Sequence, residues 1–443
     1  MGPYSALPLV FFKPGAYNTP NETPGIDPTV SLLAEVAMPK ITTRPSPRPV
    51  AEDVSRPDLC VFIGRFSPLH KGHETVIQKG LNCANKMLVL VGSAFEARSH
   101  RNPFTVAERM DMISATFFHP NLLVRPLENS SYNLNEWIER VHTAVAEAWA
   151  ELRAADPSLP AKPQVALIGH SKDESSYYLN LFPLWRSINV PQEIALSATS
   201  IRENLFGSAE RMTDLLDEAE KEDPITKKKM STAVYLSKYL PQARAQALAY
   251  LEREAKDVMS VQTIAFLKEF VIGDAFQAVG EEFAFVARYR YSWRLAPYEP
   301  TFVTADAVVV QSGHILLVKR KAFPGKGLWA LPGGFVERND TIENTVFKEL
   351  EEETGIRVPQ AVLRGHVKAK EVFDDPHRSS RGRTVTTAYL IHLKPGPLPK
   401  TKKGGLVDDE ETLAVQWVPL VDLKREDFFE DHYSIITNMV KRI

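Results

Sequence analysis

The chain has 443 residues, 44% of them hydrophobic and 24% charged, which is the composition of a globular protein rather than a fibrous or disordered one. This length exceeds one ordinary hydrophobic core and is sufficient for two or three. The 53 Lys and Arg nearly balance the 55 Asp and Glu, and the net charge of -2 argues against a bulk nucleic-acid binder or a membrane-surface protein.

The chain contains two cysteines, Cys60 and Cys83. Two are too few for a disulfide scaffold and indicate a reducing compartment, so we expect a cytoplasmic protein. No apolar run approaches the roughly 20 residues that span a bilayer. The first residues also lack a basic start followed by an apolar stretch, so no secretory signal is predicted.

Residues 1–57 form a proline-rich extension with 11 prolines. Proline removes backbone donors and disfavours regular structure, so we expect this stretch to be mostly disordered. Two alternatives stay open. One is a transit peptide, against which Glu22, Asp27 and Glu35 argue, and the other is a translation start further along, at Met38.

Residues 58–206 alternate between short apolar runs and longer helical stretches. This alternation predicts parallel β-α-β units in an open, doubly wound, Rossmann-like sheet. A capping box, Thr105 with Glu108, begins one helix. The predicted strands are 59–63, 86–91, 122–124 and 165–168, and the other predicted helices are 72–84 and 135–152.

Two helical regions follow this domain. Residues 207–258 are predicted to be a charged helical insertion, and residues 259–300 a helical connector. We interpret the charge runs 217–223 and 227–229 as a solvated helix face. The insertion is a candidate surface for assembly between copies of the chain, so a homo-oligomer is one open possibility.

The loop after the first predicted strand is rich in groups that bind phosphate. It comprises Gly64-Arg65-Phe66-Ser67-Pro68-Leu69-His70-Lys71-Gly72-His73. Glycine allows the backbone to turn sharply and approach a ligand closely. His70 and His73 lie three residues apart at the start of a helix, beside free N–H groups that themselves attract anions. We therefore predict a cradle for a polyphosphate.

A second segment of this kind is Leu196-Ser197-Ala198-Thr199-Ser200-Ile201-Arg202. Ser200 with Glu203 predicts another capping box, so hydroxyls, free N–H groups and a guanidinium converge at a helix N-terminus. Arg202 has a planar fork that suits phosphate oxygens. For Ser197 and Thr199, simple helix capping is the alternative.

Together the two segments resemble the nucleotidylyltransferase superfamily with the H-x-G-H signature. With Asn102-Pro103-Phe104-Thr105, Trp137 and residues 168–173 added, the stretch 58–206 is similar to the archaeal-type nicotinamide-nucleotide adenylyltransferases. This resemblance implies transfer of AMP from ATP to nicotinamide mononucleotide, which gives NAD and pyrophosphate. The nicotinate analogue is the alternative acceptor.

The resemblance also implies roles for individual residues. Asn102 and Trp137 would bind nicotinamide mononucleotide, although a core position on an amphipathic helix is the alternative for Trp137. Because the acceptor phosphate is already ionised, catalysis needs only positioning and charge neutralisation, with Mg²⁺ assisting. ATP would be bound by Gly64, Arg65, Phe66, His70, His73, Ser197, Thr199 and Arg202, of which His70, His73 and Arg202 are the catalytic residues.

A hairpin, 301–310 with 315–318, is predicted to open a last domain over residues 301–443. Within it, an acidic helix is expected to start at an N-cap pair, Asp340 with Glu343, and to end at Gly355. Its main feature is a set of three carboxylates on one helix face, which repel each other unless cations lie between them. Hard oxygen ligands of this kind suit Mg²⁺ or Mn²⁺, and a solvent-facing acidic helix is the alternative. The three are Glu349, Glu352 and Glu353.

The helix resembles the Nudix box, G-x5-E-x7-R-E-U-x-E-E-x-G-U, beginning at Gly334. The resemblance implies an α/β/α-sandwich domain in which Glu349, Glu352 and Glu353 hold the metal and a metal-bound water attacks a diphosphate, with one box glutamate, Glu352 or Glu353, as base. Two positions depart from the pattern, because Asp340 replaces Glu and Lys348 replaces Arg. Lys348 keeps the charge but loses the bidentate fork.

Segments outside the box are similar to the ADP-ribose pyrophosphatase branch, in particular to bifunctional proteins that join this hydrolase to the adenylyltransferase. They are residues 329–332, 373–376, 378–383 and 429–432. The implied reaction is ADP-ribose to AMP and ribose 5-phosphate. Arg378, Arg381 and Arg383 would bind the diphosphate, and a plain surface loop is the alternative.

Two further hypotheses belong to other classes of protein. In the first, the last domain binds ADP-ribose as a sensor without hydrolysing it, which the departures at Asp340 and Lys348 allow. The second, a DNA-binding regulator, is disfavoured by the slightly acidic net charge and by the lack of a helix-turn-helix pattern. We therefore expect ATP, nicotinamide mononucleotide and ADP-ribose as partners, and neither nucleic acid nor membrane.

Overall fold

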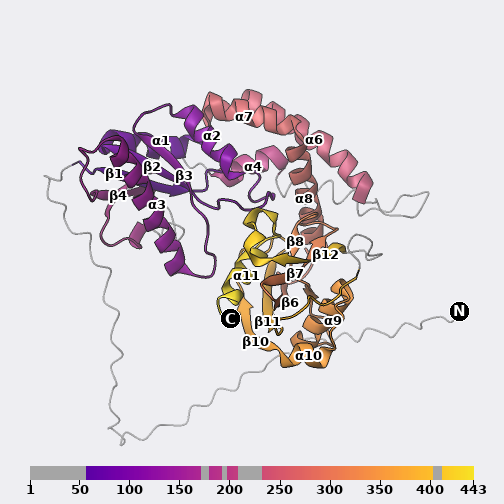
Figure 1. Ribbon diagram of the computed structural model, residues 1–443. Coiled ribbons are helices and arrows are strands. Elements are labelled where there is room, and N and C mark those ends of the chain that lie inside the picture. The colour runs from indigo at the N-terminus through magenta and orange to yellow at the C-terminus, as the bar shows by residue number, and fades with distance from the viewer. Residues whose placement is uncertain (1–55, 171–178, 192–196, 208–231, 403–411) are drawn as a thin grey trace, which may run out of the picture. The chain divides into compact units, whose positions relative to one another are not determined.

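The computed structural model describes residues 56–170, 179–191, 197–207, 232–402 and 412–443 (Figure 1). The predicted disordered extension, apart from its last two residues, lies outside the described residues. So do the charge runs 217–223 and 227–229. The described part of the chain forms two sheets, each with its own helices.

The first sheet has five parallel strands in the order β3-β2-β1-β4-β5. This confirms the predicted doubly wound class, and β5 is a strand that the sequence pattern did not reveal. The strands are β1 (Leu59–Gly64), β2 (Lys86–Val91), β3 (Leu122–Pro126), β4 (Val165–Gly169) and β5 (Arg186–Asn189). The helices between and after them are α1 (Lys71–Cys83), α2 (Val106–Thr116), α3 (Leu134–Ala155) and α4 (Ala198–Phe206).

Both faces of this sheet are covered, which explains why β1 is apolar throughout. Cys60 and Phe62 point into one core, which contains buried residues of α1 and α2. Leu59 and Val61 point into the other core, which contains buried residues of α3. Side chains alternate between the faces of a strand, so a strand covered on both sides has no polar positions.

Three long helices continue from this domain: α6 (Thr232–Arg253), α7 (Val261–Ile272) and α8 (Asp274–Tyr291). Tyr239, Ala243 and Ala247 of α6 are buried in the same core as the α1 face of the first sheet. The described half of the predicted insertion is therefore an amphipathic helix that packs onto the first domain. The predicted boundaries of the insertion, 207–258, and of the connector, 259–300, stay predictions.

The second sheet has seven strands and is mixed, with the main order β10-β11-β6-β7-β12 and with β8 and β9 paired to β7 and β6. Alternate residues of β6 enter two cores, one shared with α9 and one with α11, so the expected α/β/α sandwich is confirmed. The strands are β6 (Thr301–Gln311), β7 (His314–Arg320), β8 (Trp329–Ala330), β9 (Gly333–Phe335), β10 (Val367–Phe373), β11 (Arg383–His392) and β12 (Thr412–Pro419). The helices are α9 (Ile342–Thr354), α10 (Gln360–Gly365) and α11 (His432–Val440).

The helix starts show where local sequence signals succeed and fail. The capping box of Thr105 and Glu108 is formed as predicted. The box predicted at Ser200 is wrong, because α4 begins one turn earlier and the Ser197 hydroxyl accepts from the Ser200 N–H at 3.1 Å. Several adjacent hydroxyl residues offer competing registers there, and local sequence does not rank them.

The N-cap predicted for the acidic helix is also wrong. The Thr341 hydroxyl accepts from the Asn344 N–H, while Asp340 accepts from the Thr341 N–H just before the helix. The predicted end is confirmed, since Gly355 adopts a left-handed conformation with φ of 55°. Glycine tolerates this conformation without steric cost, which is why it ends the helix.

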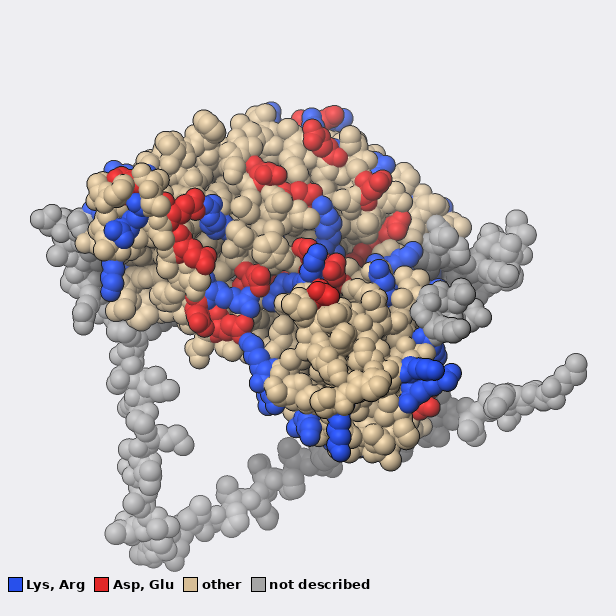
Figure 2. Space-filling model, viewed as in Figure 1, with Lys and Arg blue, Asp and Glu red and all other residues tan. Residues whose placement is uncertain are grey.

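On the face seen in Figure 2, acidic and basic side chains are mixed over the upper lobe, while Lys and Arg predominate around the edge of the lower lobe, the second domain. Within the described residues, none of the helices is both long enough and apolar enough to cross a bilayer.

The attachment of α6 to the first domain can be tested at Tyr239, whose buried hydroxyl donates to the buried Phe206 carbonyl of α4. Tyr239→Phe leaves that carbonyl without its donor, so we expect unfolding free energy to fall by about 1–3 kcal/mol. Urea unfolding measures the change. Tyr298→Phe, at a site 86% exposed, is the control and should change stability by less than about 0.5 kcal/mol. Equal midpoints for both variants would show that α6 does not depend on this contact.

Candidate active sites

The loop after β1 is shaped by Phe66, which is 1% exposed and has a φ of 51°. Its ring packs edge-on against Phe62 at 5.2 Å and His73 at 4.8 Å between centroids. A Cβ atom at Gly64 would lie 2.9 Å from this ring. The lack of a side chain at Gly64 therefore leaves room for the Phe66 ring, which packs beneath the loop and holds it in place.

The two histidines of the predicted cradle lie together. Their rings stack with centroids 3.7 Å apart and planes 25° apart. His70 occupies the N-cap position of α1 and His73 its first turn. The two imidazoles thus stand at the positive end of α1, which favours phosphate. The Lys71 N–H there donates to the Val258 carbonyl and the His73 N–H to the His70 carbonyl.

The second predicted segment folds back onto this loop. The Arg202 guanidinium donates to the Ser67 carbonyl at 2.8 Å and to the Thr199 hydroxyl at 3.1 Å. Burial, and then the charge of Arg65, lower the pKa of Arg202 to about 10. The Ser197 hydroxyl caps α4 and lies 2.9 Å from the Ser200 hydroxyl, and its role in binding ATP stays a prediction. Two segments far apart in the sequence therefore build one cationic site.

Arg109 was not predicted as a site residue, yet it is fully buried beneath this loop. Its guanidinium donates to the carbonyls of Arg65, Gly92 and Ser93 at 2.8, 2.6 and 2.9 Å and to Thr105 at 3.2 Å. Burial lowers the pKa of Arg109 to about 10. The sequence signal available was a basic residue on the buried face of α2, and its partners are backbone groups, which no motif displays.

His170 is a second residue whose role the sequence did not reveal. Its Nδ1 lies 2.7 Å from the Val190 carbonyl, and its Nε2 lies 3.2 Å from the Gly72 carbonyl. The ring therefore bridges the end of β4 to the first turn of α1. It fixes α1 relative to the sheet at the place where His73 projects.

The two residues predicted to bind nicotinamide mononucleotide differ in their surroundings. Asn102 is 7% exposed and lines a cavity, and its two amide atoms have no hydrogen-bond partner among the described residues. Trp137 packs on α3 against the core, 6.2 Å from the Phe182 ring. The core alternative describes its present packing, and the stacking role stays a prediction.

In the second domain, two of the three predicted carboxylates meet strand β9. Glu353 is 9% exposed and accepts from the Gly333 N–H at 2.9 Å. A Cβ atom at Gly334 would lie 2.4 Å from Glu349 Oε1. Glu352 is exposed. The glycines thus let a strand pass against two carboxylates that stand one helical turn apart.

This donor set fits a divalent cation bound together with a substrate. Within the described residues, no group of three or more His, Cys, Asp or Glu side chains forms a closed metal cage. Mg²⁺ is commonly held by one or two carboxylates, with substrate phosphates and water as the other ligands. Glu349 and Glu353 supply such a pair, and only glycine leaves room for it.

Lys348, which replaces the arginine of the Nudix pattern, forms an ion pair at the protein surface. Its amine lies 2.8 Å from Glu337 Oε1, and this partner raises the pKa of Lys348. It does not hydrogen-bond to any of the three glutamates in the described structure. The backbone N–H of Gly333, rather than Lys348, orients Glu353.

The three predicted arginines have separate environments. Arg378 is 8% exposed, and its fork binds both oxygens of Asp431 at 2.9 Å. Its predicted contact with a diphosphate stays a prediction. Arg383 donates to the Asp374 carbonyl. Arg381 lies over the rings of Phe335 and Phe429, at 5.0 and 5.7 Å. Of these three arginines, Arg381 therefore contacts a residue of β9, Phe335.

Asp306 is a buried carboxylate beside β9 that the sequence analysis did not single out. It accepts from the Thr386 hydroxyl, and its Oδ1 would lie 2.5 Å from a Cβ atom at Gly333. Burial raises the pKa of Asp306 to about 6, against the lowering effect of Arg378. Its ionisation at neutral pH therefore costs folding free energy.

This cost predicts a pH dependence of stability. Between the usual pKa of 3.8 and about 6, the unfolded chain releases a proton that the folded domain keeps. The stabilising contribution is present below pH 4 and is lost as pH rises through 6, by about 3 kcal/mol in full. Urea unfolding of the wild type and Asp306→Asn at pH 4 and pH 7.5 measures it, and the stability of the wild type relative to the variant should fall. Parallel pH profiles would contradict the assignment.

Comparison with known proteins finds relatives of both domains. The family model "Cytidylyltransferase-like" matches residues 61–204, and the model "NUDIX domain" matches residues 300–439. A nicotinamide/nicotinic acid mononucleotide adenylyltransferase of Acinetobacter baylyi is 37% identical over 34% of this chain and 76% of its own length. An ADP-ribose pyrophosphatase of Methanocaldococcus jannaschii is 32% identical over 29% of this chain and 72% of its own length.

One solved structure resembles the two domains together. It is a bifunctional NMN adenylyltransferase/ADP ribose pyrophosphatase from Francisella tularensis, complexed with AMP and a manganese ion. It is 30% identical and covers 87% of this chain and 99% of its own, with a TM-score of 0.66. Since the histidine loop and the acidic helix stand in two cores of matching folds, the chain belongs to the family of bifunctional nicotinamide mononucleotide adenylyltransferases and Nudix ADP-ribose pyrophosphatases.

Proposed function

We propose that the chain transfers AMP from ATP to nicotinamide mononucleotide in its first domain and hydrolyses ADP-ribose to AMP and ribose 5-phosphate in its second. The observation that carries the proposal is the meeting of Arg202 with Ser67, which joins two distant segments into one cationic cradle. The pairing of Glu353 with Gly333 forms the matching acidic site. The two charged clusters stand beside different hydrophobic cores, so each reaction has its own phosphate-binding or metal-binding groups.

The first reaction needs no general base, because the acceptor phosphate is already an anion. His70 and His73 hold the phosphates of ATP at the start of α1, and the backbone N–H groups add to their field. Arg202 neutralises the departing pyrophosphate. Arg109 keeps the loops after β1 and β2 in register, so the acceptor is aligned for an in-line attack on the α-phosphorus.

In the second reaction, Glu349 and Glu353 would hold a divalent cation, which supplies charge neutralisation on the diphosphate and acidifies a water molecule. Glu352 is exposed next to this pair and is the candidate to accept the proton of the attacking water. Arg381 binds the diphosphate from the opposite side, over Phe335. We propose Mg²⁺ as the cation, and a cytoplasmic location where ATP and Mg²⁺ are abundant.

A paired assay of the full chain tests both assignments. His73→Ala removes one phosphate ligand, and we expect NAD formation to fall at least about 100-fold while ADP-ribose hydrolysis is unchanged. Glu353→Gln removes a metal-binding charge and should have the reverse effect. The measurements are NAD formed from ATP and nicotinamide mononucleotide, and AMP released from ADP-ribose with Mg²⁺ or Mn²⁺.

Each alternative has its own outcome in this assay. Turnover of the nicotinate nucleotide alone would reassign the acceptor. Tight binding of ADP-ribose without AMP release would make the second domain a sensor. Loss of both activities in either variant would show that the two sites are not independent.

The close approach of Gly334 to Glu349 gives a second test. Gly334→Ala places a methyl group where the Glu349 carboxylate lies. We expect hydrolysis to fall at least about tenfold, because the Glu349 carboxylate is pushed away from the cation that it would hold together with Glu353. Gly365→Ala is a matched control, because a Cβ atom there meets nothing within 4 Å. Steady-state ADP-ribose hydrolysis and Mn²⁺ titration are the measurements. Unaltered Mn²⁺ affinity in Gly334→Ala would remove Glu349 from the metal site.

A further inference from the structure

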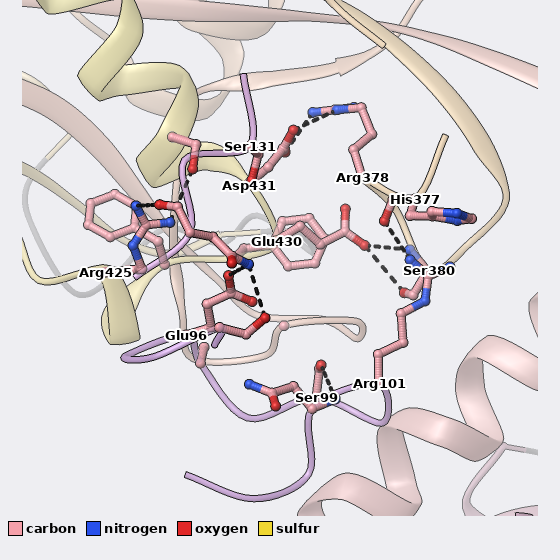
Figure 3. A pocket seen from close by; sticks show the side chains of 18 of the residues that line it. Glu96, Ser99, Arg101, Ser131, His377, Arg378, Ser380, Arg425, Glu430 and Asp431 are labelled. Atoms are coloured by element: carbon pink, nitrogen blue, oxygen red, sulfur yellow. Dashed lines mark hydrogen bonds and ion pairs between the residues drawn. The ribbon is translucent and has the colours of Figure 1, made fainter. Parts of the chain in front are cut away.

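A cavity of about 340 Å³ lies between the first domain and the second, and the predicted ligand-binding residues Arg65 and Asn102 are among those that line it. Figure 3 shows labelled residues of both domains around it. The volume lies within the range of sites that bind small molecules. Its lining includes Arg65, Asn102 and Asn129 of the first domain and Arg425, Glu430 and Asp431 of the second.

The first-domain wall of the cavity is built from the loops that follow β1, β2 and β3. Arg65 follows β1, Glu96 and Asn102 follow β2, and Asn129 follows β3. These loops leave the carboxyl ends of parallel strands, the edge at which open α/β sheets bind ligands. Arg65 also belongs to the histidine loop, so the cavity begins beside the site where ATP phosphates are expected.

The wall contains polar groups that the protein itself leaves unsatisfied. The amide oxygen and nitrogen of Asn102 are buried and have no partner among the described residues. The Arg65 side chain is exposed and likewise makes no hydrogen bond or ion pair with the described residues. A buried unpaired amide costs about 1–3 kcal/mol, so its presence beside a cavity points to a ligand.

The second domain holds this wall in place through Arg425. One of its nitrogens donates to the Asn129 carbonyl at 3.0 Å and the other to the Ser434 hydroxyl at 3.1 Å. The Asn129 amide in turn donates to Ser93 at 3.0 Å and to Glu96 at 2.8 Å. A chain of contacts thus runs from the second domain through the β3 loop to the β2 loop.

Other contacts across the same boundary involve the same loops. Arg101 of the β2 loop donates to the carbonyls of His377 and Ser379. Tyr132, which follows β3, donates to Asp431, whose carboxylate is fixed by Arg378. The second domain therefore makes hydrogen bonds to the loops of the first domain that follow β2 and β3.

The charges around the cavity are of both signs. Its lining contains Arg65 and Arg425 together with Glu96, Glu430 and Asp431. A ligand with a positive ring and a negative phosphate matches such a lining, and a carboxamide matches the donor and acceptor of Asn102. Nicotinamide mononucleotide has all three groups.

We propose that the second domain completes the acceptor pocket of the adenylyltransferase, with Arg425 as the residue that positions its β3 and β2 loops for nicotinamide mononucleotide. This inference rests on the proposed function and deepens it. Asn102 pairs with the carboxamide at one end of the cavity. Arg65 attracts the phosphate at the end beside His70 and His73, where the adenylyl group arrives.

The test uses the full chain and separates KM from kcat. Arg425→Met keeps the stem but removes the hydrogen bond to Asn129. We expect KM for nicotinamide mononucleotide to rise about tenfold, while KM for ATP and the rate of ADP-ribose hydrolysis change less than twofold. Arg425→Lys, which retains one donor, should restore part of the affinity.

A matched control removes a different contact across the same boundary. Lys441 binds Glu136 of α3 at 2.5 Å, and neither residue lines the cavity. Lys441→Met should leave both Michaelis constants unchanged. An equal rise of both Michaelis constants in Arg425→Met, a similar effect in Lys441→Met, or no effect on KM for nicotinamide mononucleotide would each overturn the proposal.

A measurement on the wild type keeps the inference testable if Arg425→Met does not fold. Nicotinamide mononucleotide should slow hydrogen exchange of backbone amides 428–434 in the second domain, and ADP-ribose hydrolysis is not involved in that readout. Absence of protection, with NAD still formed, rejects the inference alone. Absence of both NAD formation and binding rejects the proposed function instead.

Discussion

The first domain depends on one buried charge without a carboxylate partner. Arg109 is fully buried, and its donors are taken by backbone carbonyls of the loops after β1 and β2. Removing a guanidinium from water is costly unless every donor is paired. That requirement fixes both loops to one point, so the histidine loop and the loop carrying Asn102 cannot move independently. The geometry of nucleotide binding follows from this constraint.

The two domains handle phosphorus with opposite chemistry. In the first, Arg202 and the stacked imidazoles of His70 and His73 form a hydrogen-bonding cluster that we propose binds a polyphosphate. In the second, Glu349 and Glu353 bring negative charge together, and we propose that a divalent cation neutralises it. Both sites place a backbone element unusually close to a side chain, and in both glycine makes this possible.

The boundary between the domains carries several specific polar contacts, beside the packing of the Tyr132 ring on Phe373. Arg425, Arg101 and Tyr132 each hold a backbone or carboxylate group across it. Glu282 of α8 adds a further link, because it accepts from the N–H groups of His100 and Gly325. Hydrogen bonds fix orientation more strictly than apolar burial does, and this suits loops that must align a substrate.

Local sequence determined the strands β1, β2, β3 and β4 and the residues of both charged clusters, because periodicity and motif spacing are properties of neighbouring residues. The sandwich of the second domain is implied by the resemblance of its acidic helix to the Nudix box. Only the tertiary structure decided that Arg378 is occupied by Asp431 and that Arg109 and Arg425 hold the loops. Their partners are distant in the chain, and most are backbone carbonyls, which every residue carries. The packing of the folded chain therefore decides which carbonyl accepts a hydrogen bond from which guanidinium.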